Sequence, residues 1–319
     1  MNFTRPTLRI GSRGSELALW QSNHIKSKLE SLYPNLTVTL EIIHTTGDKI
    51  LDSPLSLIGG KGVFTVELER ALLRNEIDIA VHSLKDLPTQ LGEGLAVAAI
   101  PARANVEDAF LSNTPAAKLF ELRKGATIAT GSLRRKAQIL ARRPDYQIVD
   151  IRGNVPTRIR KLRESDWDGM ILASAGMERL GLGGEIAHHI PTKDMLPAPG
   201  QGALAIEARN NDVEVAKLLF PLEDQAARLS SSTEREILHA LGGGCQLPLG
   251  TFVRKEGGEY LIDACIAYPS GNGMLRSQLH SNETSLIQNA KKIAEEFLSK
   301  GGAQMIAYLT DMEQVEKTY

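Results

Sequence analysis

Cysteine is almost absent from this chain of 319 residues, which contains only Cys245 and Cys265. Two cysteines are too few for the disulfide framework of a small secreted domain. The first residues, MNFTRPTLRIGSRGS, lack the apolar stretch of a secretory signal, and no run approaches the roughly 18 apolar residues that a membrane span needs. We therefore expect a cytoplasmic globular protein with no membrane partner.

An excess of charge of either sign is also missing. The formal net charge is −1 at pH 7, so the overall charge does not favour binding to nucleic acid. The hydrophobic content of 42% and the charged content of 24% are ordinary for a soluble protein, and the length suffices for two or three domains with cores of their own. Any site for an anion must therefore come from local clustering of cations.

Short apolar runs alternate with segments of helical period over most of residues 7–180. The predicted strands are 7–12, 36–45, 77–83, 126–130, 146–152 and 169–175, and the predicted helices are 15–32, 64–76, 133–143, 157–164 and 176–180. Alternation of this kind predicts parallel sheets that are covered by helices on both faces.

The rest of the chain has a different pattern. The segment PAPGQGALAIEAR (197–209) is rich in proline and glycine and indicates a crossing between two lobes. Residues 250–273 predict antiparallel strands joined by glycine-containing turns, and residues 285–302 predict one amphipathic helix that ends at a glycine. The expected fold class is α/β, with two α/β lobes and a small C-terminal α+β domain.

Arginines recur where a predicted strand gives way to a helix. These junctions hold Arg13, Arg134, Arg135, Arg152, Arg158, Arg160 and Arg179. The macrodipole disfavours cations at a helix N-terminus, so their repetition there indicates a function. In parallel sheets such junctions meet at the C-terminal edge of the strands, where ligands bind. The pattern predicts a cleft for a molecule with several carboxylate or phosphate groups, which arginine binds through paired N–H donors.

Other basic segments have a simpler interpretation. We expect exposed helix faces with weak surface ion pairs for Arg142, Arg143, Lys161 and Arg163. The segment GGKGVF lacks the G-x-x-x-x-G-K-[ST] spacing of a phosphate loop. The segment GLGG at 181–184 follows a predicted helix rather than a strand, so it is not a dinucleotide fingerprint.

The motif VHSLKDLP places Lys85 and Asp86 directly after a strand that is predicted to be buried. Pro88 restricts Leu87 to extended geometry, so a helix should not start there at once. Spacing alone leaves two interpretations open. In the first, Lys85 and Asp86 simply lie on an exposed turn. In the second, Asp86 transfers protons or stabilises a developing cation in a positively charged cleft.

The histidines and the second cysteine give no sign of a metal site. We expect His82, one residue before a strand end, to be packed or to cap the strand. His44 and the neighbours His188 and His189 lack metal-ligand partners at workable spacing. Cys265 lies within the strand-like segment LIDACIAY and is expected to be a core thiol.

Cys245 lies in the segment LGGGCQLPLG, where neighbouring glycines favour display of its side chain. Three roles remain open from the residues alone: a catalytic nucleophile, the attachment point of a covalent cofactor, or an unreactive thiol in a turn. His239 lies six residues upstream, which does not establish a catalytic dyad.

The chain also contains seven ordered motifs: LRIGSRGSELALWQ, GGKGVF, DIAVHSLKDLP, ATGSLRRKAQ, IRGNVPTR, PGQGALAIE and GGCQLPLG. In this order they resemble the porphobilinogen deaminase (hydroxymethylbilane synthase) family. The resemblance extends from about residue 7 to the C-terminus.

The resemblance implies a transferase of tetrapyrrole (haem- or chlorophyll-type) biosynthesis. Members of this family condense four porphobilinogen molecules head to tail into hydroxymethylbilane and release ammonia at each step. They build the product on a dipyrromethane primer, joined by a thioether to the cysteine that Cys245 matches. The resemblance also implies a monomer with three domains. Domain 1 comprises residues 1–101 and 200–222, domain 2 comprises 102–199, and domain 3 comprises 223–319. The first two look like the lobes of periplasmic binding proteins.

Roles for individual residues follow from the same resemblance. Asp86 matches the catalytic aspartate of the family. The residues that would hold the primer are Cys245, Lys85, Asp86, Thr130, Ser132, Arg134, Arg135 and Arg158. The residues that would bind the substrate and the growing polypyrrole chain are Arg13, Ser15, Phe64, Arg152, Arg158, Arg179 and Gln201.

The chemistry of the family fits these residues. Each pyrrole unit bears an acetate and a propionate, so every condensation adds two negative charges to a cleft that arginines line. Asp86 can stabilise the positive charge left by loss of ammonia and can accept hydrogen bonds from pyrrole N–H groups. The sequence departs from the family at Gly242, where Glu is frequent, and at Thr46 and Leu57, where some members have basic residues; the segment ATGS replaces Gly-Thr-Ser-Ser.

Two other functions remain open from the residues. One is a two-lobed polyanion-binding protein without catalysis, in which Cys245 is structural. The other is an acyl or alkyl transferase that uses Cys245 as a nucleophile and keeps the thiol free at rest. The mass of the intact protein distinguishes the primer-bearing transferase from both of them, because only a tethered primer adds the mass of a dipyrromethane.

Overall fold

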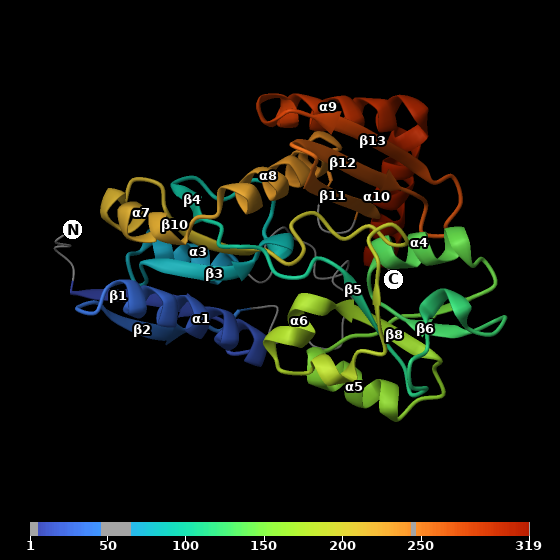
Figure 1. Cartoon of the computed structure of the whole chain (residues 1–319), viewed down its shortest axis with the longest axis horizontal. Helices are drawn as coiled ribbons and strands as arrows, with labels where there is room; N and C mark the ends of the chain where they lie inside the picture. Colours follow the sequence, from blue (N-terminus) through green and yellow to red (C-terminus); the bar gives the residue numbers. More distant parts are fainter. Residues whose placement is uncertain (1–5, 46–64, 244–246, 319) are drawn as a thin grey trace. The chain divides into compact units, whose positions relative to one another are not determined.

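The structure is a computed structural model that describes residues 6–45, 65–243 and 247–318. Within these residues the chain forms two compact units. The first contains 6–45, 65–104 and 203–228, and the second contains 105–202, 229–243 and 247–318. Figure 1 shows the elements of both units, most of them labelled. The three domain boundaries expected from the sequence stay a prediction.

The first unit is built on a mixed five-stranded sheet with the order β2-β1-β3-β10-β4. Its strands are β1 (Thr7–Ser12), β2 (Thr37–Ile42), β3 (Ile79–Ser83), β4 (Leu95–Ala99) and β10 (Leu204–Arg209). β1 runs parallel to β2 and β3, whereas β10 runs antiparallel to β3 and β4. The expectation of a purely parallel sheet is therefore wrong here, because the second half of the segment 197–209 returns as a strand.

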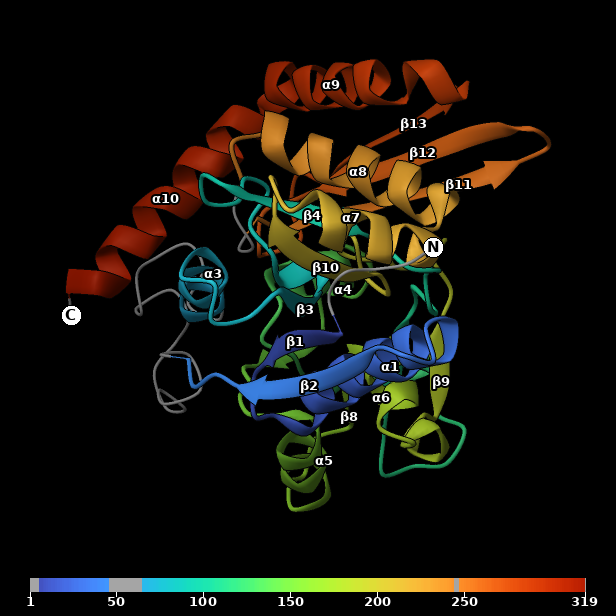
Figure 2. The ribbon, with the colours of Figure 1, turned by 90° about the vertical axis from the view of Figure 1, so that its left-hand side faces the viewer.

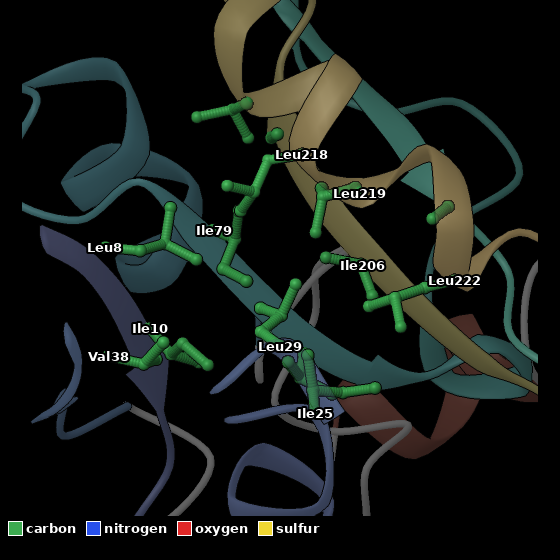
Figure 3. Close-up of a cluster of buried hydrophobic side chains, with 14 of the residues drawn as sticks. Leu8, Ile10, Ile25, Leu29, Val38, Ile79, Ile206, Leu218, Leu219 and Leu222 are labelled. Carbon is green, nitrogen blue, oxygen red and sulfur yellow. The ribbon is translucent and has the colours of Figure 1, made fainter. Parts of the chain in front are cut away.

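Helices cover both faces of this sheet, as predicted. They are α1 (Glu16–Leu32), α3 (Val66–Leu73) and α7 (Val213–Leu219). On one face, Leu29 of α1 and Leu219 of α7 pack with Ile79 of β3 in a buried cluster, which Figure 3 shows. On the other face, Leu72 of α3 packs with Ala80 of β3.

The second unit contains another mixed five-stranded sheet, with the order β7-β6-β8-β5-β9. Its strands are β5 (Asp108–Leu111), β6 (Thr127–Ala129), β7 (Gln147–Val149), β8 (Gly169–Ala173) and β9 (His188–Ile190). β6 runs parallel to β7 and β8, and β5 runs antiparallel to β8 and β9. This sheet thus repeats the mixed pattern of the first one.

Helices again cover both faces of this second sheet. They are α4 (Leu133–Arg142), α5 (Val155–Arg163) and α6 (Ser174–Arg179). Ile139 of α4 packs with Ile128 of β6, whereas Leu162 of α5 packs with Ala129, the next residue of the same strand. Successive side chains of a strand point to opposite faces, so α4 and α5 lie on opposite sides of the sheet, as Figure 1 also shows.

The second unit also contains a small antiparallel sheet with the order β11-β12-β13. Its strands are β11 (Leu249–Glu256), β12 (Glu259–Ile266) and β13 (Leu275–Ser281). The helices that pack on it are α9 (Leu286–Phe297), α10 (Ala303–Thr318) and α8 (Gln225–Ala240), whose first four residues belong to the first unit. Gly257 and Gly258 join β11 to β12 with φ values of 57° and 99°, a tight turn that needs glycine. Ile237 of α8 and Ile293 of α9 pack with Ile262 of β12, and Figure 2 shows both helices along the sheet.

The helix expected over 285–302 is divided in two. It ends at Phe297, and a π turn over Leu298–Gly302 leads into α10. Gly301 has a φ of 111°, which interrupts the helical geometry as predicted, but the chain then resumes a helix. Short 3-10 helices complete the described elements: η1 (Leu84–Asp86), η2 (Leu119–Glu121), η3 (Gly183–Glu185), η4 (Phe220–Leu222) and η5 (Glu283–Ser285).

The predicted fold class of two α/β lobes and a small C-terminal α+β region is confirmed. In the part of the chain that the structure describes, no helix combines the length and the apolar character that crossing a membrane requires. The same residues contain no group of three or more His, Cys, Asp or Glu side chains that could hold a metal ion.

Candidate functional site

Asp86 lies in a short turn that directly follows β3 in the first unit. Leu84 and Leu87 on either side are buried, and Leu84 N–H donates to the carbonyl of Ala203 at 3.0 Å. Leu87 is extended, with φ −77° and ψ 137°, as predicted from the proline that follows it. The two leucines fix the turn, while Asp86 is exposed and its carboxylate makes no hydrogen bond or ion pair with another described residue.

Arg13 and Ser15 follow the neighbouring strand β1. β1 and β3 pair in parallel, with Ile10 opposite Ile79, so their carboxyl ends lie at one edge of the sheet. Arg13 is half-buried there. Ser15 caps α1, because its hydroxyl accepts a hydrogen bond from Ala18 N–H at 3.4 Å. The structure therefore brings Arg13 and the turn of Asp86 to the same edge, as the spacing of the motifs predicts.

His82 is a packed side chain, as predicted. Its Nε2 lies 2.9 Å from Glu207 Oε2, and both residues are buried in the sheet of the first unit. The pair joins β3 to β10 below the turn of Asp86. Sequence reasoning did not find Glu207, because β10 comes from a distant part of the chain.

In the second unit, the loop between β6 and α4 carries Thr130 and Ser132. Thr130 is buried, and its Oγ1 accepts a hydrogen bond from Ser132 N–H at 3.3 Å. The Ser132 hydroxyl accepts from Arg135 N–H at 3.4 Å and caps α4. Both hydroxyls thus fix the backbone that leads into the arginines.

Arg134 and Arg135, which sequence reasoning assigned to the lining of a cleft, are nearly enclosed, with exposed fractions of 4% and 6%. Both donate to the carboxylate of Asp108, which is fully buried. Burial would raise the pKa of Asp108, but the charges of the two arginines outweigh burial and hold that pKa well below its ordinary value. Burial in turn lowers the pKa of Arg135, and Asp108 opposes that shift.

Gln201 belongs to the same cluster. Its Nε2 donates to Asp108 Oδ1 at 3.0 Å and to the carbonyl of Val106 at 2.7 Å. Its neighbours Gly200 and Gly202 have φ values of 73° and 85°, so the backbone here adopts a conformation that favours glycine. The predicted cleft residue Gln201 is therefore fully buried beside the arginine pair.

Three further arginines follow β7 and β8. Arg152 Nε donates to Asp150 Oδ2 at 3.2 Å, and Arg158 Nε donates to the carbonyl of Gly153 at 2.7 Å. Because β6, β7 and β8 are parallel neighbours, these arginines and the pair on α4 lie at one edge of the second sheet.

Arg179 is the last residue of α6 rather than a residue of its first turn, so the expectation of a cation at this helix N-terminus is wrong. The helix begins at Ser174, directly after β8, earlier than the sequence pattern indicated. Arg179 Nη2 donates to the carbonyl of Gly202 at 2.7 Å. Arg179 is half-buried, and this burial lowers the pKa of its guanidinium.

Of the basic residues expected on exposed helix faces, the three arginines make ion pairs. Arg142 pairs with Asp194, and Arg163 pairs with Glu185, in each case at an exposed position. Arg143 is less exposed than predicted, because its guanidinium pairs with Asp145 and lies over the ring of Tyr146. Lys161 Nζ donates to the carbonyl of Arg152 at 3.1 Å.

Of the two cysteines, the structure describes only Cys265. Cys245 lies outside the described residues, as do Phe64, Thr46 and Leu57. Gly242, two residues after the end of α8, has a φ of 67° and allows the backbone to leave the helix. Cys265 is confirmed as a core thiol, since it is buried in β12 and its burial raises the pKa of the thiol to about 12.

Comparison with known proteins identifies the relatives of this chain. Residues 8–217 match the family model described as "Porphobilinogen deaminase, dipyromethane cofactor binding domain". The chain is 47% identical to the porphobilinogen deaminase of Syntrophomonas wolfei subsp. wolfei, over 94% of this chain and 97% of the relative. It is 45% identical to the porphobilinogen deaminase of a Roseiflexus species, over 95% and 99% of the two chains.

Among solved structures, the chain matches the substrate binding domain of a putative molybdenum ABC transporter from Clostridium difficile. It has 9% sequence identity and a TM-score of 0.42, and the match covers 69% of this chain and 93% of the transporter domain.

Proposed function

Because the chain belongs to the porphobilinogen deaminase family, we propose that it condenses four porphobilinogen molecules head to tail into hydroxymethylbilane, with release of ammonia. It is a transferase of tetrapyrrole biosynthesis. The single observation that carries this proposal is the near full-length match to porphobilinogen deaminases from several bacteria. The alternative of a polyanion-binding protein without catalysis is not favoured by that match.

The cations at the edge of the second sheet suit a substrate that carries carboxylates. Two guanidinium groups, on Arg134 and Arg135, share the single carboxylate of Asp108, which leaves one positive charge in excess. Arg134 Nε is buried and has no hydrogen-bond partner among the described residues. A ligand carboxylate would provide the missing acceptor and balance the charge.

These residues also fit the dipyrromethane cofactor of the family, whose pyrroles bear acetate and propionate groups. When bound, the cofactor supplies the terminal pyrrole carbon to which the first porphobilinogen is joined. We assign its thioether attachment to Cys245. The side chains that would hold it are Lys85, Asp86, Thr130, Ser132, Arg134, Arg135 and Arg158. In the described structure, Thr130 and Ser132 contribute by fixing the loop before α4.

Asp86 is the proposed catalytic residue. Its carboxylate is exposed at the end of β3, on a turn that Leu84 and Leu87 anchor in the core. A fixed carboxylate there can accept hydrogen bonds from pyrrole N–H groups and stabilise positive charge that develops on the substrate as ammonia leaves. It can also accept and return a proton at its Oδ atoms.

Substrate and product contacts are assigned to Arg13, Ser15, Phe64, Arg152, Arg158, Arg179 and Gln201. Among those of these residues that the structure describes, the arginines supply N–H donors for the carboxylates of the substrate and product. Ser15 and Gln201 contribute through the backbone and the buried cluster that they fix. We further propose that the protein acts as a monomer in the cytoplasm, a location that its low cysteine content supports.

The experiment that tests the proposed function is turnover of porphobilinogen by the purified protein. Consumption of substrate should release ammonia and yield one linear tetrapyrrole for every four molecules of ammonia. Consumption without ammonia, or binding without consumption, would contradict the proposal.

A further inference from the structure

Asp108 is a fully buried carboxylate between two arginines, and none of the motifs in the sequence pointed to it. We propose that Asp108 is a positioning residue for primer binding. It fixes the guanidinium groups of Arg134 and Arg135 and leaves their site with one positive charge, so that the site accepts one carboxylate of the dipyrromethane. This inference rests on the proposed function.

The geometry shows how one carboxylate orders three side chains. Arg134 Nη1 donates to Asp108 Oδ2 at 2.7 Å, and its Nη2 donates to Oδ1 at 3.2 Å. Arg135 donates to Oδ1 from Nε at 3.1 Å and from Nη2 at 2.8 Å. Gln201 Nε2 donates to the same oxygen at 3.0 Å. These bonds hold both guanidinium planes before any ligand arrives, which is the condition for a preorganised site.

Backbone carbonyls complete the fixation of the pair. Arg134 Nη1 donates to the carbonyl of Leu196 at 2.7 Å, and Arg135 Nη1 donates to that of Ile171 at 2.9 Å. The Arg134 Nε atom stays without a partner among the described residues although it is buried. A buried donor without an acceptor raises the free energy of the folded state. Such a donor is expected where a bound ligand supplies the acceptor.

The topology explains why Asp108 reaches these arginines. β5 runs antiparallel to β8 and begins with Asp108, which pairs with Ala173 at the end of β8. The first residue of β5 therefore lies at the same edge of the sheet as the loops that follow β6 and β8. Asp108, as the first residue of β5, therefore lies beside the first turn of α4, which carries Arg134 and Arg135.

A purely structural role is the competing explanation, and the chain contains a matched control for it. Asp263 of the small antiparallel sheet is also buried. It accepts hydrogen bonds from Arg276 Nε and Nη2 at 3.1 and 2.8 Å and from Gln278 Nε2 at 2.8 Å. Asp108→Asn and Asp263→Asn thus remove the same charge from similar Asp–Arg–Gln clusters, only one of which adjoins the proposed primer site.

The test measures primer loading by the mass of the intact protein. Wild-type protein and both variants are produced in cells that cannot make porphobilinogen and are then incubated with porphobilinogen below their unfolding temperatures. Wild type and Asp263→Asn should gain the mass of a dipyrromethane at similar rates. Asp108→Asn should gain it about 100-fold more slowly, the effect expected when a binding group is misplaced by about 1 Å.

Loading of Asp108→Asn at the rate of Asp263→Asn would overturn the inference. Failure of the wild type to gain mass would instead contradict the proposed function and would say nothing against the arginine geometry. If Asp108→Asn does not fold, Asp108→Glu replaces it, because this variant keeps the charge and displaces the carboxylate by one methylene. Slow loading of a folded Asp108→Glu protein supports positioning, and loading at the wild-type rate overturns it.

Discussion

His82 Nε2 lies 2.9 Å from Glu207 Oε2, and this contact joins β3 to β10 inside the first unit. The two residues are diagonal neighbours, two positions apart in the antiparallel register, since His82 pairs with Ala205 and Glu207 pairs with Ala80. The turn of Asp86 begins two residues after His82, and the adjoining backbone is bonded to the start of the β10 segment through Leu84 and Ala203. The contact therefore stabilises the strands from which the proposed catalytic residue extends.

Replacement of Glu207 by Ala should lower the free energy of unfolding by about 2 kcal/mol, because it leaves the buried His82 ring nitrogen without its hydrogen-bond partner. Urea-induced unfolding measures the change. Glu76→Ala is the control, since Glu76 pairs with Arg74 at an exposed position and its loss should change stability by no more than about 0.5 kcal/mol. Equal effects of the two substitutions would show that the His82 contact contributes little.

Asp86→Asn should keep the primer and lose turnover. The amide occupies the same space but can neither hold a proton nor balance positive charge, so the rate should fall by at least about 100-fold. Ammonia release measures turnover, and the mass of the intact protein checks that the primer is present. Asp166→Asn changes an exposed carboxylate of the second unit and should leave the rate unchanged. A normal rate for Asp86→Asn would remove Asp86 from the proposed role.

Arg134→Leu should impair primer assembly, because it removes the buried Nε donor and one of the two cations bound to Asp108. We expect most of the purified protein to have the mass of the unmodified chain. Arg142→Leu changes an exposed arginine of the same helix, paired with Asp194, and should load normally. Arg134→Leu protein that carries a full complement of primer would contradict the assignment of this arginine.

Cys265 should be unreactive in the folded protein. Burial raises the pKa of its thiol to about 12, so a thiol reagent at pH 8 finds almost no thiolate. After unfolding, a loaded chain should react with one equivalent of reagent, because the thioether blocks Cys245. Reaction of two equivalents would mean that the Cys245 sulfur is free.

The same thiol makes stability depend on pH at the alkaline end. The folded pKa lies above the ordinary value of about 8.5, so the contribution is complete below that pH and is lost as the pH rises toward 12. The difference in unfolding free energy between the wild type and Cys265→Ser should therefore shrink from about pH 8.5 upward. A constant difference would contradict the raised pKa.

Much of the fold could be predicted because local patterns determine it. The turn around Asp86 follows from a buried strand and Pro88, and the β11–β12 hairpin follows from Gly257 and Gly258. Strand direction has no such local signal, so the antiparallel insertion of β10 was missed. α8 was also missed, because its inward face includes the buried polar residues Ser231 and Glu234, which obscure the apolar period of the helix.

The arrangement of the candidate site could likewise be predicted only in part. Alternation of strands and helices predicts correctly that Arg13 and the turn of Asp86 lie at one edge of the first sheet, and that the arginines after β6 and β7 lie at one edge of the second. It does not predict that Asp108, at the start of β5, pairs with Arg134 and Arg135. The start of β5 reaches the first turn of α4 only because β5 pairs with β8. Nor does it reveal the hydrogen bond that Gly200 N–H donates to Glu234 Oε2 at 2.8 Å, which links α8 to the loop of Gln201. Contacts of this kind depend on tertiary structure.

The most direct test of the central claim is the mass of the intact, purified protein. The account predicts a mass above that of the sequence by a tethered dipyrromethane, and the loss of this increment in Cys245→Ser. An unmodified mass for wild-type protein that has been supplied with porphobilinogen would contradict the account, as would an increment that persists in Cys245→Ser.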